Sequence, residues 1–373
     1  MIYLDNAATT SPKPQSVINS VSNAMRKYSI NSGRGGYKTA RDTEEMIYSV
    51  RDTVATFLDA ESAENVVFTQ NCTTALNIAL FGLLKSGDHV VISPFEHNAV
   101  LRPLNQLAQI GVEYTIADCV ADMDNCKKAF ERCIRKNTVA VVCTHASNVC
   151  GAVLPLSELS DLCREYGLHF IVDGAQTAGI LPISVQKSKI DCLAVATHKG
   201  LYAPTGTGLL VTDSTPNPLI YGGTGGDSMS PTQPKEIPER YESGTLNPVM
   251  IAGIGAGVKF VSPMQEQIYK HEMRLLKIVE NEFKKNSSIK TYTIPNAKIV
   301  PVLSFNVEDK TSSEVAMLLD RYGIAVRAGL HCAPLAHKTL GTLDRGTVRF
   351  APSVFTTDSE IEYFLKCISK ISK

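Results

Sequence analysis

The stretch Cys192-Leu-Ala-Val-Ala-Thr-His-Lys199 runs from an uninterrupted apolar segment directly into a histidine and a lysine. An apolar run of this length is typical of a strand that is buried on both faces of a sheet. A second run, His169-Phe-Ile-Val-Asp173, precedes it and ends in an aspartate. Because ligands of open α/β sheets sit beyond the C-terminal ends of the strands, both endings carry candidate site residues.

Similar apolar runs recur on both sides of these two, and amphipathic stretches separate them. We expect further strands at residues 65–69, 89–93, 139–143 and 208–212, and helices at residues 73–84, 99–110 and 156–166. Buried strands separated by helices indicate an α/β fold with a mostly parallel sheet covered by helices. Pro, Gly and Ser crowd residues 215–232, which are predicted to form a long irregular loop.

The C-terminal part of the chain has the pattern of a smaller α+β unit. We expect a helix at residues 263–285, a strand at 299–306, a helix at 312–322, a strand at 348–350 and a last helix from Asp358. The 373 residues exceed one typical core. We therefore predict a large domain at residues 15–255 and a small α+β domain built from residues 1–14 and 256–373.

The composition favours a small substrate over a charged polymer or a membrane. Lys+Arg and Asp+Glu both total 37, so no charge surplus predicts nucleic acid as a partner. No apolar run is long enough to cross a bilayer, and the start of the sequence lacks a signal-peptide pattern, so a cytoplasmic location is expected. The ten cysteines fit a reducing compartment, and they form no Cys-x-x-Cys pair, so we predict no metal site.

Lys199 and Asp173 are the first candidates for chemistry. Desolvation at a strand end would lower the pKa of the lysine and make its amine a nucleophile toward an aldehyde. A carboxylate at a strand end needs a partner, and a protonated pyridine nitrogen would supply one. The alternatives are a solvated loop lysine and an aspartate that caps the following turn.

Three more strand endings carry polar residues that could reach the same cleft. Thr73 lies at the predicted start of a helix, where free N–H groups bind phosphate, although N-capping would explain it equally well. His97 follows the strand at 89–93, where its ring could lie over a cofactor, and its alternative is a structural histidine. Asn148 follows the strand at 139–143, and its alternative is a turn asparagine.

The C-terminal unit adds a thiol and a guanidinium. Cys332 lies in the turn-rich loop Arg327-Ala-Gly-Leu-His-Cys-Ala-Pro334, where cationic neighbours would favour the reactive thiolate. Its alternative is one more buried structural cysteine. Arg349 lies in a short apolar strand and could hold a substrate carboxylate through two hydrogen bonds, or form a structural ion pair.

Taken together, these motifs resemble the class V aminotransferase family, and within it the cysteine desulfurases and selenocysteine lyases. The resemblance runs from Tyr3-Leu-Asp-Asn-Ala-Ala8 to Arg349. It includes Asp-x-Ala-Gln176, His-Lys199, Arg-Tyr-Glu-Ser-Gly-Thr245 and Arg-x-Gly-x-His-Cys332 in that order. It implies the fold of type I pyridoxal-phosphate (PLP) transferases, PLP as cofactor, and a homodimer with sites at its interface.

The resemblance also implies a role for each matching residue. Lys199 matches the Schiff-base lysine, Asp173 the partner of the pyridine nitrogen, Gln176 the ligand of the phenolic oxygen, and His97 the histidine stacked on the ring. Thr73 and His198 match phosphate ligands, Cys72 offers a backbone N–H there, and Thr245 matches a threonine that reaches the neighbouring subunit's phosphate. Asn148 and Arg349 match groups that hold the substrate carboxylate, and Cys332 matches the sulfur-accepting cysteine of the compact, group II type.

The activity that the resemblance implies is conversion of L-cysteine to L-alanine with a persulfide on Cys332, which a protein acceptor could then receive. Alternatives are lysis of L-selenocysteine, another class V lyase or aminotransferase reaction, and a non-catalytic scaffold. The stretch from residue 351 to 357 departs from the family's usual ending, which bears on the substrate pocket. A nicotinamide dehydrogenase fits least, because no Gly-x-Gly-x-x-Gly follows the first strand.

Overall fold

A seven-stranded sheet forms the centre of the computed structural model, which describes residues 1–32, 35–120, 123–226 and 228–373. Its order is β2-β8-β7-β6-β5-β3-β4. The strands are β2 (Val66–Thr69), β3 (His89–Ile92), β4 (Glu113–Ile116), β5 (Thr138–Thr144), β6 (His169–Asp173), β7 (Cys192–Val195) and β8 (Gly208–Thr212). All neighbours pair in parallel except β8, which is antiparallel to β7 and β2. The predicted α/β fold with a mostly parallel sheet is confirmed.

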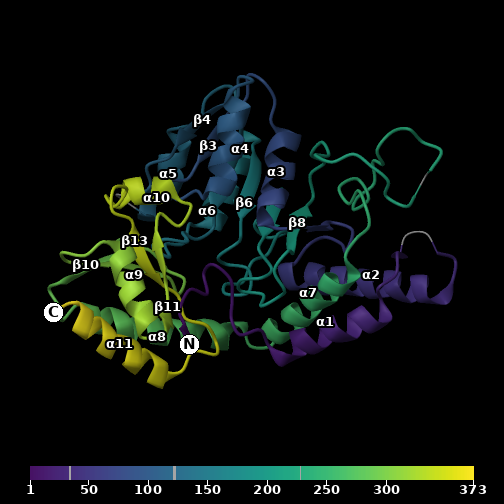
Figure 1. Ribbon diagram of the computed structural model, residues 1–373. Helices are drawn as coiled ribbons and strands as arrows, with labels where there is room; N and C mark the ends of the chain where they lie inside the picture. Colours follow the sequence, from purple (N-terminus) through teal and green to yellow (C-terminus); the bar gives the residue numbers. More distant parts are fainter. Residues whose placement is uncertain (33–34, 121–122, 227) are drawn as a thin grey trace.

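Helices cover both faces of this sheet (Figure 1), because alternate strand residues point to opposite sides and both sides are apolar. Val90 and Ile92 pack in one core with α3 (Cys72–Leu83) and α4 (Asn98–Ala108). Val91, which lies between them, belongs to the opposite core. That core includes residues of α5 (Cys126–Glu131), which follows the 3-10 turn η2 (Met123–Asn125), and of α6 (Leu156–Tyr166).

Three helices that the sequence patterns did not predict lie together at one side of the sheet (Figure 1). They are α1 (Gln15–Lys27), α2 (Lys38–Leu58) and α7 (Pro248–Val261). Helix α7 is rich in glycine, which normally argues against a helix. Its packing explains the glycine, because a Cβ at Gly257 would lie 2.2 Å from the Leu201 carbonyl oxygen.

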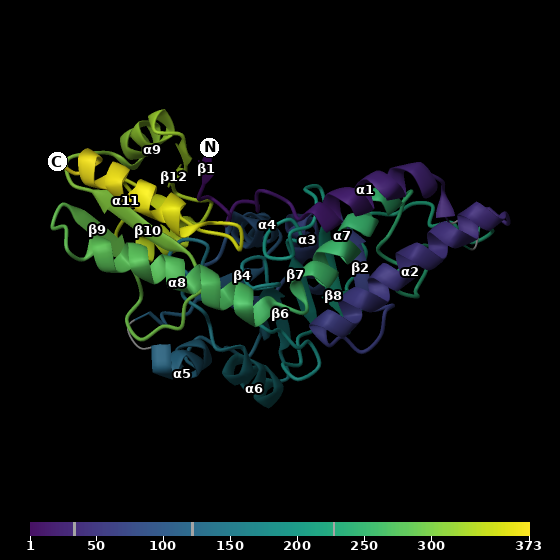
Figure 2. The same ribbon diagram turned by 90° about the horizontal axis from the view of Figure 1, so that it is seen from below.

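The C-terminal part forms an antiparallel four-stranded sheet with helices packed on it, and Figure 2 shows α8 and α11 running along its outer side. The sheet order is β12-β13-β10-β9. Its strands are β9 (Ile289–Tyr292), β10 (Leu303–Val307), β12 (Arg327–Gly329) and β13 (Thr347–Phe350), and the helices on it are α8 (Gln265–Phe283), α9 (Ser312–Arg321) and α11 (Asp358–Ile371). The short helix α10 (Pro334–Thr339) instead packs through Ala336 into a core of the large sheet. The strand predicted from residue 299 begins only at Leu303, since Pro301 has no N–H for the ladder.

The N-terminus joins this C-terminal part. Strand β1 (Ile2–Tyr3) pairs in parallel with β11 (Ile324–Ala325), and Asp5 then bridges to Ala351. The segment that follows passes toward the large sheet, because the Thr10 N–H donates to the His198 carbonyl. The chain therefore brings residues from its first turns next to both sheets, and the domain bounds given above stay a prediction.

The stretch between β8 and α7 contains no helix or strand among its described residues, in agreement with the predicted loop, of which residue 227 lies outside the described part. None of the described helices combines the length and the apolar character needed to cross a bilayer.

Candidate active site

A cavity of about 220 Å³ lies beyond the C-terminal ends of β3, β5, β6 and β7, where the sheet topology places ligands. Nine of the predicted site residues line it: Cys72, Thr73, His97, Asn148, Asp173, Gln176, His198, Lys199 and Arg349. Cys332 lies beside it, with its Sγ 3.6 Å from Nη2 of the lining residue Arg327. Residues that are distant in sequence therefore converge on one cavity, apart from Thr245.

Lys199 and Asp173 provide an amine and a carboxylate inside this cavity. Burial lowers the pKa of the Lys199 amine, and the nearby Asp173 carboxylate partly opposes that shift. A lowered pKa enlarges the neutral, nucleophilic fraction of the amine at pH 7. Asp173 is buried, and its Oδ1 accepts from the Ala175 N–H at 2.9 Å, so it also caps the turn as the alternative interpretation predicts.

The end of the cavity near α3 has the character of an anion site. Asn71 caps the helix, because its Oδ1 accepts from the Thr74 N–H at 2.9 Å. The capping role considered for Thr73 therefore belongs to Asn71. Within the described residues, the N–H groups of Cys72 and Thr73 have no hydrogen-bond acceptor, and buried Nδ1 of His198 has no partner. Free N–H groups at a helix N-terminus attract a phosphate.

Two further polar side chains, His97 and Gln176, line the cavity. Burial lowers the pKa of His97 to about 4, so its ring is neutral at pH 7, and its Nδ1 accepts from the Ala99 N–H at 3.0 Å. This contact caps α4 and fixes the ring's orientation. Gln176 donates from Nε2 to the Ala7 carbonyl at 3.0 Å. The donor set as a whole fits a phosphorylated pyridine.

Glu96, next to His97, is a buried carboxyl that the sequence patterns did not identify. Its Oε1 accepts from Ser93 Oγ at 2.5 Å and from the Thr144 N–H at 2.8 Å, and this ties the end of β3 to the end of β5. Burial raises the pKa of Glu96 to about 8, and its Oε2 has no partner in the described structure. The neutral acid is thus the form that the fold stabilises.

We expect Glu96→Gln to flatten the pH dependence of stability. Because the pKa of Glu96 in the folded state lies above its unfolded value, its contribution is complete below pH 4.5 and is lost as the pH rises toward 8. Glutamine cannot ionise, so the free energy of unfolding should fall less between pH 5 and pH 9, by on the order of a few kcal/mol. Urea unfolding at both pH values measures this, and an unchanged decline would contradict it.

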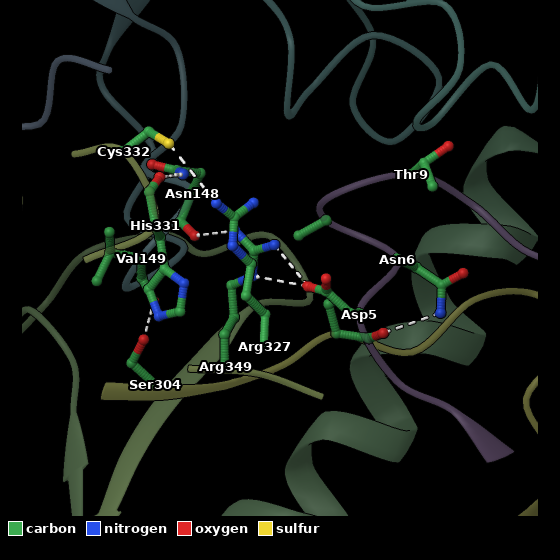
Figure 3. Close-up of polar contacts among 12 residues, drawn as sticks. Asp5, Asn6, Thr9, Asn148, Val149, Ser304, Arg327, His331, Cys332 and Arg349 are labelled. Atoms are coloured by element: carbon green, nitrogen blue, oxygen red, sulfur yellow. Dashed lines mark hydrogen bonds and ion pairs between the residues drawn. The ribbon is translucent and has the colours of Figure 1, made fainter. Parts of the chain in front are cut away.

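The loop that carries Cys332 is short and held in an unusual backbone conformation. His331 and Cys332 have φ angles of 49° and 58°, which side chains other than glycine rarely adopt. The Asn98 N–H donates to the Cys332 carbonyl at 2.7 Å, and Nδ2 of Asn148 donates to the His331 carbonyl at 2.8 Å (Figure 3). These contacts hold the thiol at the edge of the cavity, beside the Arg327 guanidinium.

Arg349 is almost fully buried, with 1% of its side chain exposed, and it has two partners. Its Nη2 lies 2.5 Å from Asp5 Oδ1, and its Nη1 donates to the Asn148 carbonyl at 3.1 Å. The structural ion pair considered as the alternative is therefore present, and the same guanidinium also lines the cavity. Sequence patterns did not identify Asp5, because 344 positions separate it from Arg349.

Thr245 is the predicted site residue that the structure places elsewhere. It is exposed and lines a different cavity, of about 480 Å³, together with Arg51 and Glu242. Those two residues form a buried ion pair at 2.8 Å. Within one chain, Thr245 therefore does not join the groups around Lys199. In the described parts of the chain, no cluster of three or more His, Cys, Asp or Glu side chains could hold a metal ion.

Comparison with known proteins decides the family. The model of the family described as aminotransferase class V matches residues 2–364. The chain belongs to this family. Its fold is accordingly the class V form of PLP fold type I, and the resemblance seen in the sequence is confirmed.

Several relatives within the class V family are named as cysteine desulfurases. The probable cysteine desulfurase of Pyrococcus abyssi is 34% identical over 388 residues, which cover 100% of this chain and 94% of that protein. The probable cysteine desulfurase of Methanothermobacter thermautotrophicus is 31% identical, with the same coverage. An apo structure of cysteine desulfurase from Thermococcus onnurineus has a TM-score of 0.91 at 32% identity and covers 100% of this chain and 94% of that one.

Proposed function

We propose that this class V protein is a PLP-dependent cysteine desulfurase that converts L-cysteine to L-alanine and leaves a persulfide on Cys332. One observation carries the proposal: a buried amine, Lys199, lines the cavity, and the Cys332 thiol lies beside it, next to the guanidinium of the lining residue Arg327. An ordinary aminotransferase needs no thiol at this place. The names of the relatives support the same activity.

The residues around the cavity provide a place for each part of PLP. Lys199 would hold the cofactor's aldehyde carbon covalently, and Asp173 would pair with its pyridine nitrogen. His97 would lie against the ring, and Gln176 would donate to the phenolic oxygen. The N–H groups of Cys72 and Thr73 and the His198 ring would bind the phosphate. When bound, PLP supplies an electron sink that stabilises negative charge at the substrate's Cα.

Side chains of this protein would then bind the substrate, move the proton and accept the sulfur. Arg349 and Asn148 hold the substrate carboxylate, and the Lys199 amine, once free, moves the Cα proton. The Cys332 thiolate attacks the substrate sulfur, so that an S–S bond forms as the Cβ–S bond breaks. The electron pair of the broken bond remains with the carbon skeleton, which takes up protons and leaves as L-alanine. Cys332 retains the transferred sulfur for an acceptor thiol.

The product assay that tests the activity uses the purified holoenzyme and L-cysteine. We expect one transferred sulfur, counted on Cys332 and on the acceptor thiol together, for each L-alanine, because each turnover forms one L-alanine and moves one sulfur. A keto acid in place of alanine would indicate transamination and would contradict the proposal. The ten cysteines are all free, which suits a reducing setting, and we propose the cytoplasm for that reason.

We further propose that the enzyme is a homodimer in which Thr245 serves the neighbouring subunit's phosphate site. Thr245 is exposed and remote from its own chain's cavity, as such a role requires. The loop before it exposes Leu219, Ile220 and Tyr221 by 41%, 52% and 69%. Several exposed apolar side chains in one stretch are typical of a surface that a protein partner covers.

Subunit mixing tests this assignment. Thr245→Ala alone should weaken PLP binding by about tenfold, as expected for one lost hydrogen bond to a charged group. A mixed dimer of Thr245→Ala and Lys199→Ala chains has both defects in one site and none in the other. Refolding the two variants together should therefore yield more activity at limiting PLP than the two measured separately. An activity equal to their sum would contradict a role across the interface.

A further inference from the structure

Asp5 holds the guanidinium of Arg349 by one edge. Its Oδ1 accepts from Arg349 Nε at 3.2 Å and from Nη2 at 2.5 Å (Figure 3). Both donors lie on the same side of the planar group, so a single carboxylate oxygen fixes that side. The plane of the guanidinium is therefore set by a residue from the N-terminal segment, while Arg349 itself comes from β13.

Among the described residues, the contacts with Asp5 and Asn148 leave two N–H hydrogens of the Arg349 guanidinium without an acceptor. A guanidinium has five N–H hydrogens: one on Nε and two on each Nη nitrogen. Asp5 takes the hydrogen on Nε and one on Nη2, and the Asn148 carbonyl takes one on Nη1 at 3.1 Å. One hydrogen remains on each Nη nitrogen. The end of a guanidinium that carries both Nη nitrogens can donate to a carboxylate in a bidentate contact.

Asp5 is itself held firmly. Its residue bridges to Ala351, just after β13, and its carbonyl accepts from the Tyr3 hydroxyl at 3.2 Å and from the Ala8 N–H at 3.0 Å. The side chain is only 15% exposed. A fixed acceptor can orient a long side chain such as arginine, whose rotamer freedom would otherwise be lost when substrate binds.

Asp5 also distinguishes two arginines that lie opposite each other. Arg327 and Arg349 are direct partners on the antiparallel strands β12 and β13. Asp5 pairs with Arg349, whereas the Arg327 guanidinium is directed to Cys332 Sγ at 3.6 Å (Figure 3). The Arg349 guanidinium thus has an edge that can bind a carboxylate, whereas the Arg327 guanidinium lies beside the Cys332 sulfur.

We propose that Asp5 is a positioning residue that presents the two free N–H groups of Arg349 to the substrate carboxylate. The inference rests on the proposed function, which assigns that carboxylate to Arg349. It predicts that loss of Asp5 weakens binding only of ligands that carry the carboxylate. A purely structural role would weaken the binding of every ligand.

Matched ligands separate these roles. The holoenzyme is titrated with L-alanine and with L-alaninamide, which has the same shape without the negative charge, and the absorbance of the bound cofactor reports the Kd. Asp5→Ala should raise the Kd of L-alanine by at least about tenfold and that of L-alaninamide by less than about twofold. An unchanged Kd of L-alanine, or an equal rise for both ligands, would overturn the proposal.

Two further variants complete the design. Asp5→Asn keeps an oxygen that can accept from Nε and Nη2, so it should stay within about threefold of the unaltered Kd for L-alanine. If Asp5→Ala yields no folded protein, Asp5→Glu provides the test. It keeps the negative charge but displaces the Arg349 guanidinium, so it should raise the Kd of L-alanine more than that of L-alaninamide. Equal Kd changes for both ligands in Asp5→Glu would also overturn the proposal.

Arg349→Lys separates failure of this inference from failure of the proposed function. If Arg349→Lys leaves the preference for L-alanine over L-alaninamide intact, Arg349 does not hold the carboxylate, and both assignments fall. If Arg349→Lys removes that preference and Asp5→Ala does not change it, only the role of Asp5 is wrong.

Discussion

Lys199→Ala is expected to lower kcat for L-cysteine by at least about 10⁴-fold, because one amine is proposed to hold the cofactor and to move the Cα proton. The amine is suited to both tasks, since burial lowers its pKa and thereby enlarges its neutral fraction. The cofactor should still bind, since its proposed phosphate and ring contacts come from other residues. Borohydride reduction should no longer attach it to the chain.

The matched control is Lys187→Ala, because Lys187 is an exposed lysine outside the cavity. It should keep both the activity and the borohydride-stable attachment. Mass analysis of digested protein after reduction identifies the modified peptide. Attachment to a peptide other than the one containing Lys199, or turnover by Lys199→Ala near the unaltered rate, would show that another lysine fills this role.

Cys332→Ser is expected to lower the rate of L-alanine formation from L-cysteine by roughly 10²- to 10³-fold and to abolish persulfide formation. A serine hydroxyl is a far weaker nucleophile than a thiolate. The serine can keep the contacts of the loop backbone to Asn98 and Asn148. Bound cofactor and its absorbance should therefore be unchanged, so the defect is confined to sulfur transfer.

Cys133→Ser provides the control for this variant. Cys133 and Cys332 are the two cysteines that are only partly buried, so both can be modified from solvent. Cys133 donates to the Ala129 carbonyl within a helix–turn region and does not line the cavity. Persulfide that survives in Cys332→Ser and disappears in Cys133→Ser would reverse the assignment.

The central sheet could be predicted from the sequence because its strands are buried on both faces. Strands β6 and β8 and helix α6 have the bounds that were expected. Edge strand β4, whose residues are all exposed or half-buried, has no such apolar run. The sequence pattern did not indicate helix α7 because of its glycines, which the close packing of this helix on Val50, Leu201 and Pro204 requires.

The cavity could be predicted because its residues follow strand ends, and parallel strands end at the same edge of a sheet. Asp173 and Lys199 are of this kind. Asp5 could not be found in this way, because its function depends on a contact with Arg349 across nearly the whole chain. Glu96 resembles an ordinary loop acid in the sequence, and only its burial between β3 and β5 sets it apart.

Arg327 illustrates a partial prediction. Its place in the cysteine motif indicated a cationic neighbour for Cys332, and the structure brings its Nη2 within 3.6 Å of Sγ. The motif could not show that His331 and Cys332 both adopt positive φ angles, because this conformation arises from contacts with Asn98 and Asn148 outside the loop.

The most direct measurement is to incubate the holoenzyme with L-cysteine, quantify L-alanine, and determine by mass analysis which cysteine peptide has gained sulfur. If Lys199 and Cys332 act in one cavity, alanine forms and the peptide containing Cys332 is heavier by one sulfur atom. Alanine release with the extra sulfur on another cysteine, or no alanine at all, would contradict the proposed reaction.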